Sequence, residues 1–139
     1  MRLRGLVVAG ACLAVLLILV YLEPAGGGHG THEQLGGAPC SFLAKTGWPC
    51  PTCGVTTSLA AMAHGQVHLA WRAQPFGVPL FLSLVAVTVV GAVELVANRS
   101  VLHRLRPRLW WAIAILAGVL AGWGWKAAAG YLEGIYPLP

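Results

Sequence analysis

Long apolar stretches along the chain predict three membrane-spanning helices. They cover residues 5–22, 76–97 and 109–129, and each contains at most one charged residue. About 20 mostly apolar residues in a helix are enough to cross the hydrocarbon core of a bilayer. A helix also satisfies its backbone polar groups internally, and none of the three stretches alternates as a half-buried strand does. We therefore expect an all-α integral membrane protein that forms a single membrane domain over residues 1–139.

The composition excludes several other classes of protein. Of 139 residues, 58% are hydrophobic and only 9% are charged, whereas about a quarter of the residues of a soluble domain are charged. A soluble globular domain, a disordered chain and a coiled coil are therefore not expected. The sequence contains no Asp, which excludes a Ser-His-Asp triad, and its four acidic residues are scattered. An enzymatic activity is accordingly less expected than a non-enzymatic role.

The basic residues predict how the chain is oriented in the membrane. Two precede the first apolar stretch and four lie between the second and third, namely Arg2, Arg4, Arg99, Arg104, Arg106 and Arg108. Basic residues in short loops stay in the cytoplasm, so we expect residues 23–75 and the C-terminus outside, in a bacterial inner membrane. Nucleic-acid binding is not expected, because these residues flank apolar stretches. The first stretch exceeds a signal-peptide core and precedes no A-x-A site, so we expect it to be retained.

The connection between the first two stretches, residues 23–75, carries most of the residues capable of chemistry. It contains three of the four Cys and four of the five His. Cys40 is followed by a Cys-Pro-Thr-Cys-Gly element at residues 50–54, and two short helices, interfacial or re-entrant, are expected between residues 54 and 73. The proline favours a turn and the glycine permits a positive φ. The two thiols of the element are therefore expected to lie close together.

Three chemistries are compatible with this loop. In the first, Cys40, Cys50 and Cys53 supply thiolates to zinc or another thiophilic metal, and His32 or His29 is the fourth ligand. In the second, Cys50 and Cys53 form a dithiol–disulfide pair at a helix start, which favours thiolate, and Cys40 is the resolving thiol. In the third, one structural disulfide forms in an oxidising compartment and leaves one outer Cys unpaired.

The cysteine element also resembles a known family. The quoted positions are Cys40, residues 47–56 (Gly-Trp-Pro-Cys-Pro-Thr-Cys-Gly-Val-Thr), Gly65-Gln66, Ala70 and Gln74-Pro75. Together they are similar to an uncharacterised bacterial membrane family filed as domain of unknown function 2752, over roughly residues 38–97. The resemblance implies a small integral membrane protein with a cysteine motif beside a membrane segment, and it implies no activity. Thr57, Gln66 and Gln74 replace the Arg, Asp and Asn usual in the family, so an Arg–Asp pair is not available here.

Other unusual residues of the apolar stretches suggest anchoring and helix packing. Glu94 is expected near the inner interface, and Lys126 near the outer interface with its ammonium reaching toward water. Four Trp residues bracket the third stretch and are expected to form an aromatic belt: Trp110, Trp111, Trp123 and Trp125. Gly118 and Gly122 form a small-residue face that is expected to pack on another span, on a membrane-protein partner or on a second copy of the chain.

Three functions remain open from the sequence. The first is a small integral membrane protein of unknown activity whose outer loop is structural or binds a metal or a partner. The second is an accessory protein of thiol–disulfide exchange. The third is a small subunit of a larger membrane complex, because three short spans bury little surface alone. The lipid bilayer is the expected partner in all three.

Overall fold

The chain folds into helices, as the apolar pattern predicts. The computed structural model describes residues 2–97 and 109–138, with side chains for residues 6–96 and 109–138, and this part of the chain contains no strand. In chain order the elements are α1 (Arg2–Tyr21), the 3₁₀ helix η1 (Thr31–Leu35), α2 (Ser41–Thr46), α3 (Val55–Ala63), α4 (Val67–Ala73), α5 (Gly77–Ala97) and α6 (Leu109–Leu132). The long helices match the three apolar stretches, and α3 and α4 match the two short helices expected in the loop.

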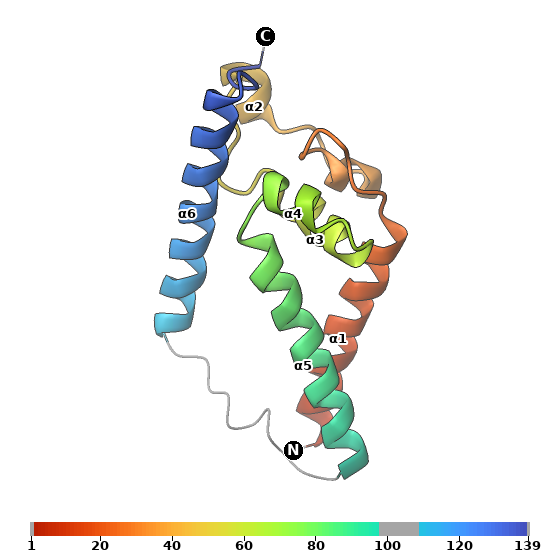
Figure 1. Ribbon diagram of the computed structural model, residues 1–139. Helices are drawn as coiled ribbons and strands as arrows, with labels where there is room; N and C mark the ends of the chain where they lie inside the picture. Colours follow the sequence, from red (N-terminus) through yellow and green to blue (C-terminus); the bar gives the residue numbers. More distant parts are fainter. Residues whose placement is uncertain (1, 98–108, 139) are drawn as a thin grey trace.

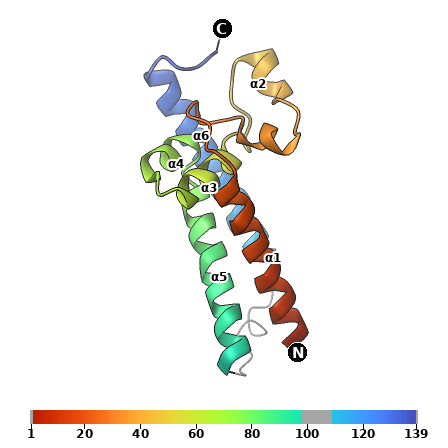
Figure 2. The same ribbon diagram turned by 90° about the vertical axis from the view of Figure 1, so that its right-hand side faces the viewer.

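The helices α1 and α5 lie side by side, and α3 and α4 lie across their loop-side ends (Figures 1 and 2). Leu19 and Leu22 at the end of α1 pack with Ala60 of α3, and Phe81 and Leu84 of α5 complete this small apolar core. The core therefore sits where the long helices meet the loop.

The α3–α4 pair is held together by small residues and one hydroxyl group. Ala60 and Ala70, from the two facing helices, are completely buried. Ser58 Oγ lies 2.8 Å from Ala70 O and 2.9 Å from Gln74 O. Small side chains bring the helix backbones close enough for one hydroxyl of α3 to reach carbonyls at the end of α4. This pair forms a platform between the long helices and the cysteine segment.

Two of the long helices meet the length and composition requirements of a membrane span. These are Gly77–Val96 and Leu109–Leu132, and a shorter apolar helix covers Leu6–Tyr21. Most side chains of the three helices are exposed, and such a large exposed apolar surface is rare on a soluble monomer. The features suggest association with a membrane. The Arg-rich connection that predicts the orientation lies outside the described residues, so the orientation stays a prediction.

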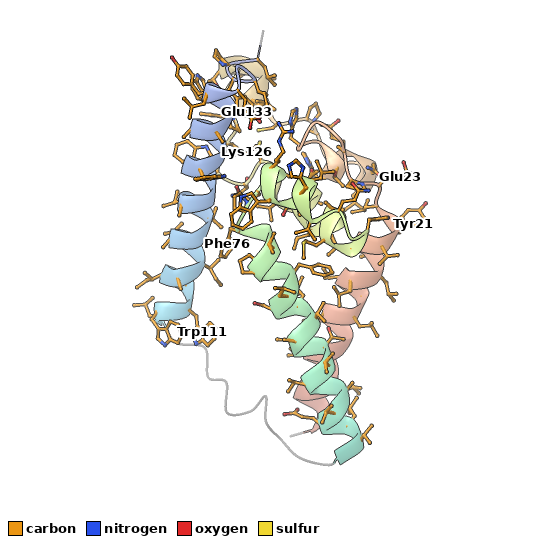
Figure 3. All side chains as sticks on the ribbon, in the orientation of Figure 1. Tyr21, Glu23, Phe76, Trp111, Lys126 and Glu133 are labelled. Atoms are coloured by element: carbon orange, nitrogen blue, oxygen red, sulfur yellow. The ribbon has the colours of Figure 1, made fainter. Side chains whose placement is uncertain are left out.

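The helix α6 stands apart from α5 near Leu109 and meets the rest of the protein at the loop end (Figure 1). There its glycines are contacted from within the chain. A Cβ at Gly118 would overlap the Phe76 ring, and a Cβ at Gly122 would lie 3.3 Å from atoms of Gln74 and Phe76. Figure 3 shows Phe76 between α6 and the start of α5. The small-residue face thus packs on residues of the same chain, and its use by a second copy or a partner stays a prediction.

Candidate metal and thiol site

Three cysteines that are distant in sequence converge at the loop end. The Sγ atoms of Cys40, Cys50 and Cys53 all lie within 4.8 Å of one another, and this is the group of potential metal ligands found among the described residues. The Sγ atoms of Cys50 and Cys53 are 2.9 Å apart and form a hydrogen bond. All four cysteines are free thiols, and Cys12 lies separately in α1. The expectation that Cys50 and Cys53 lie close together is confirmed, and Cys40 joins them.

Local backbone geometry places each thiol. Cys40 directly precedes α2. The backbone N–H of Cys53 donates to Cys50 O at 3.0 Å, which closes the turn through Pro51 and Thr52. Gly54 then begins α3 with a φ of 90°, a conformation that residues with a Cβ rarely adopt. The turn and the glycine therefore fix the two thiols of the Cys-Pro-Thr-Cys-Gly element against each other.

Gly54 also occupies the most crowded point of the site. A Cβ at this position would overlap Ala73 O and would lie 2.6 Å from Gly28 O and 2.7 Å from Lys126 Nζ. Real Cβ atoms do not approach other atoms so closely. The end of α4, the glycine-rich turn before η1 and α6 thus all meet at the residue that follows Cys53.

The helix α6 holds the cysteine segment through side chains of its second half. Trp123 Nε1 donates to Pro49 O at 2.7 Å. Lys126 Nζ donates to Gly28 O at 3.1 Å and to Cys53 O at 3.2 Å. Trp48 stacks on Tyr131 and Tyr136, with ring centroids 6.1 and 6.4 Å away. The cysteines are therefore positioned by contacts with the last helix of the chain.

Two of these residues differ from what the sequence indicated. The expectation that Lys126 reaches toward water is wrong: its side chain is only 5% exposed, because its ammonium is directed at carbonyls of the loop. The indole N–H of Trp123 donates to Pro49 O in the loop, so this side chain holds the loop against α6 in addition to any role in an aromatic belt. A lysine within an apolar helix was the available signal, since ionisable groups in such helices are often functional.

Gln74 is a third positioning residue. It is completely buried, and its Nε2 donates to Pro51 O at 3.2 Å and to Val119 O at 3.4 Å. Its Oε1 is buried without a hydrogen-bond partner among the described residues. The side chain thus links the cysteine turn to α6.

The two neighbouring thiols differ in acidity. Burial raises the pKa of Cys50, but hydrogen bonds with Cys53, Thr52 and Cys40 stabilise its thiolate more strongly, so that the pKa falls from 9.0 to about 7. Burial raises the pKa of Cys53 as well, and its hydrogen bond to Cys50 raises it further, to about 12. Between these two pKa values the pair therefore shares one negative charge and one proton.

The predicted histidine ligands lie beside the thiols but outside their group. A cavity of about 490 Å³ is lined by Cys40 and Cys53 together with His29 and His32. The ring of His32 has Nε2 3.1 Å from Ala38 O, whereas His29 Nδ1 is buried and has no hydrogen-bond partner among the described residues. A fourth ligand from either histidine stays a prediction.

Comparison with known proteins adds a family to this geometry. Residues 40–88 match a family described as protein of unknown function (DUF2752). The resemblance drawn from the cysteine element is confirmed. The matched segment contains all three converging cysteines, the platform helices α3 and α4, and the first half of α5. No curated protein and no solved structure matches the chain.

Proposed function

We propose that the protein is a three-span integral membrane protein that binds a divalent thiophilic metal ion, such as zinc, on the outer side of a bacterial inner membrane. One observation carries the proposal. The Sγ atoms of Cys40, Cys50 and Cys53 converge to within 4.8 Å of one another although Cys40 lies outside the Cys-Pro-Thr-Cys-Gly element. A structural disulfide requires two thiols, whereas three converging thiols match the ligand set of a zinc centre.

The surroundings supply the rest of such a centre. The cavity beside Cys40 and Cys53 contains His29 and His32, and either an imidazole or a water molecule is a suitable fourth ligand of zinc. Three thiolates and a divalent ion carry one net negative charge. The ammonium of Lys126 interacts electrostatically with the thiolates of Cys53 and Cys50, so this buried cation balances the charge of the loaded site.

The arrangement of the long helices supports the proposed topology. The N-terminal end of α1, the C-terminal end of α5 and the Leu109 end of α6 all point away from the loop end of the molecule, although the Leu109 end lies nearer to the loop than the other two (Figure 1). Six of the seven Arg residues of the sequence adjoin these three ends, and Arg72 is the exception. If the basic residues stay in the cytoplasm, the cysteine loop is outside.

The metal proposal is tested on the full-length protein purified in detergent without chelator. We expect close to one equivalent of bound zinc, and Co²⁺ substitution should give the intense thiolate-to-metal absorption of a tetrahedral site. Cys40→Ser, Cys50→Ser and Cys53→Ser should each weaken this absorption. Cys12→Ser is the matched control and should not. Negligible metal, together with equal alkylation of the three thiols with and without added zinc, would reject the proposal.

Thiol–disulfide exchange is the second candidate function, and the low pKa of Cys50 favours it. Since the thiolate is the nucleophile, a pKa of about 7 predicts that alkylation of Cys50 accelerates about tenfold from pH 6 to pH 8 and then levels off. Cys50→Ser, measured in parallel, gives the background. The reduction potential of the Cys50–Cys53 pair distinguishes thiol–disulfide exchange from a structural role. A value above roughly −300 mV supports exchange, whereas a lower value indicates a structural disulfide.

A further inference from the structure

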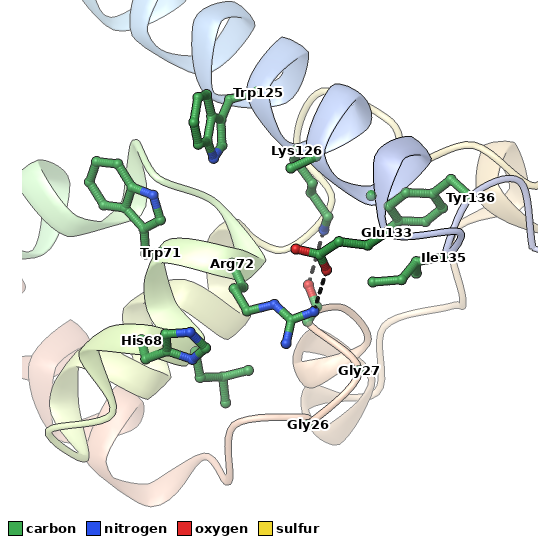
Figure 4. A pocket seen from close by; sticks show the side chains of 14 residues that line it. Gly26, Gly27, His68, Trp71, Arg72, Trp125, Lys126, Glu133, Ile135 and Tyr136 are labelled. Carbon is green, nitrogen blue, oxygen red and sulfur yellow. Dashed lines mark hydrogen bonds and ion pairs between the residues drawn. The ribbon is translucent and has the colours of Figure 1, made fainter.

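A second cavity is lined by Lys126 but by none of the cysteines. Its volume is about 580 Å³, within the range of small-molecule sites. It is an open cavity lined by α4, by the glycine-rich turn at residues 26–28 and by the second half of α6 (Figure 4). Small residues, including Ala129 and Gly130, line its α6 wall. Neither the metal site nor the thiol chemistry uses this space.

The charged groups of this cavity favour an anion. Arg72 and Lys126 line it together with Glu133, so that these three side chains carry one net positive charge. Lys126 Nζ has two carbonyl acceptors, which leaves one of the three ammonium N–H donors without a protein acceptor among the described residues. Arg72 uses Nη2 for Glu133 Oε2 at 2.6 Å, and its other N–H groups are available for a ligand.

The ion pair at the rim is suited to rearrangement. The side chains of Arg72 and Glu133 are 52% and 51% exposed, and exposed ion pairs contribute little stability. A phosphate group can therefore replace Glu133 as the partner of the Arg72 guanidinium with little loss of stability, in the bidentate geometry that Arg offers to phosphates.

The walls of the cavity favour an amphiphile. Trp71 of α4 and Trp125 of α6 line the cavity, and both rings are about half exposed (Figure 4). Tryptophan rings concentrate at the headgroup level of a bilayer. The part of α6 closer to Leu109 presents exposed apolar side chains on the same face of the helix, such as Trp111 and Ile115. A ligand with its polar end in the cavity therefore has apolar surface along which to extend.

We propose that this cavity binds the phosphate headgroup of an anionic phospholipid, with Arg72 and Lys126 as the cationic groups, Trp71 and Trp125 at the headgroup level, and the acyl chains in the bilayer beside α6. The assignment relies on the proposed membrane insertion, and the lipid site shares Lys126 with the proposed metal site. The site therefore gives the loop end of the protein a specific attachment to the outer leaflet.

The charge of the cavity provides the first test, by native mass spectrometry of the full-length protein with equimolar phosphatidylglycerol and phosphatidylcholine of identical chains. The pH is set above the titration range of histidine. We expect phosphatidylglycerol to be preferred, and each unit of cavity charge to change the preference about fivefold. Glu133→Gln should strengthen it and Arg72→Gln should abolish it. The double variant has the wild-type cavity charge but no guanidinium for the phosphate, so its preference should stay below that of the wild type. Equal binding of the two lipids by the wild type, or a preference that does not follow this order, would overturn the proposal.

The space in the cavity provides the second test. Ala129 lines the cavity, whereas Ala128 is exposed on the same helix and does not line it. Ala129→Trp should eliminate the preference without changing any charge, and Ala128→Trp should leave it intact. Excess inorganic phosphate should not displace the lipid, because it lacks acyl chains. Complete displacement would overturn the phospholipid assignment and would identify the ligand as a free anion. Zinc binding by each variant, which should stay unchanged, shows that the loop end remains folded.

Discussion

The two halves of α6 are both apolar, yet their surroundings differ. Every residue from 109 to 117 is exposed. In the second half, Gly122, Lys126 and Gly130 are buried at intervals of four residues, so they lie on one face of the helix. Gly118 extends this face by one turn toward Phe76. The difference thus arises from small residues and one ammonium group placed on a single face, where the loop can reach them.

This difference shows what holds a helix in such a protein. Apolar side chains gain little from packing on one another when lipid is the alternative, so close approach and hydrogen bonds decide which surfaces pack. The second half of α6 offers both to the loop, through Trp123 and Lys126, whereas the described residues do not cover the first half. The cysteine site accordingly depends on a few polar contacts. Variants that remove these contacts test whether they distinguish the second half of α6 from the first.

The largest effect is expected from Gly54→Ala. The added Cβ would overlap Ala73 O and crowd Gly28 O and Lys126 Nζ at a residue with φ of 90°, so the free energy of unfolding should fall by about 3 kcal/mol. Gly65→Ala is the matched control, because Gly65 also has a positive φ but has no atom near the new Cβ. It should lose only about 1 kcal/mol. Denaturant titration in detergent measures both, and equal losses would show that strain alone, without crowding, governs Gly54.

The next largest effect is expected from Lys126→Met. Two carbonyl groups, Gly28 O and Cys53 O, would lose their donor, which should cost about 2 kcal/mol of stability. Loss of the buried cation should also weaken Co²⁺ binding at the cysteines. Lys45→Met removes an exposed charge from the same loop and should change stability by less than about 0.5 kcal/mol. Equal stabilities of the Lys126 and Lys45 variants would mean that the glycines alone hold the second half of α6 against the loop.

The long helices and the pairing of Cys50 with Cys53 were predictable from local sequence. Apolar length determines a helix in lipid, and a proline turn brings neighbouring thiols together. The approach of Cys40 was a hypothesis, because its distance from Cys50 is spanned by α2 and a turn at Gly47, whose combined direction no pattern specifies. The elements η1 and α2 were missed, since neither has an apolar periodicity long enough to recognise.

The roles of Lys126, Trp123 and Gln74 were not predictable for a different reason. Each acts on a carbonyl of a segment distant in sequence, and a carbonyl acceptor is present at every residue, so nothing in the sequence marks the partner. The position of Lys126 in an apolar helix indicated that it was unusual, but whether it turns to water or to the protein depends on tertiary structure.

A smaller effect is expected from Gly118→Ala, which probes the transition between the two halves of α6. The new methyl group would overlap the Phe76 ring, and stability should fall by about 1.5 kcal/mol. Gly124→Ala, on the same helix with no atom near the new Cβ, should raise stability by about 0.5 kcal/mol because alanine favours helix. Thermal unfolding compares the two. If both variants lower stability, and if the loss depends on protein concentration, then the glycine face joins copies of the chain and its packing on Phe76 is secondary.

The smallest effect, and the most specific, is expected from Trp123→Phe. Phenylalanine preserves the apolar ring but cannot donate to Pro49 O, which is buried beside Cys50. An unmade hydrogen bond of this kind should cost about 1 kcal/mol. Because Pro49 adjoins Cys50, part of that cost should appear as a Co²⁺ affinity lowered by up to about fivefold. Trp125→Phe changes a half-exposed ring on the adjoining face of α6 and should leave the Co²⁺ affinity unchanged. Weaker Co²⁺ binding in the Trp123 variant alone would show that the second half of α6 positions the thiols through the loop backbone; equal affinities would leave that task to Lys126 and Gln74.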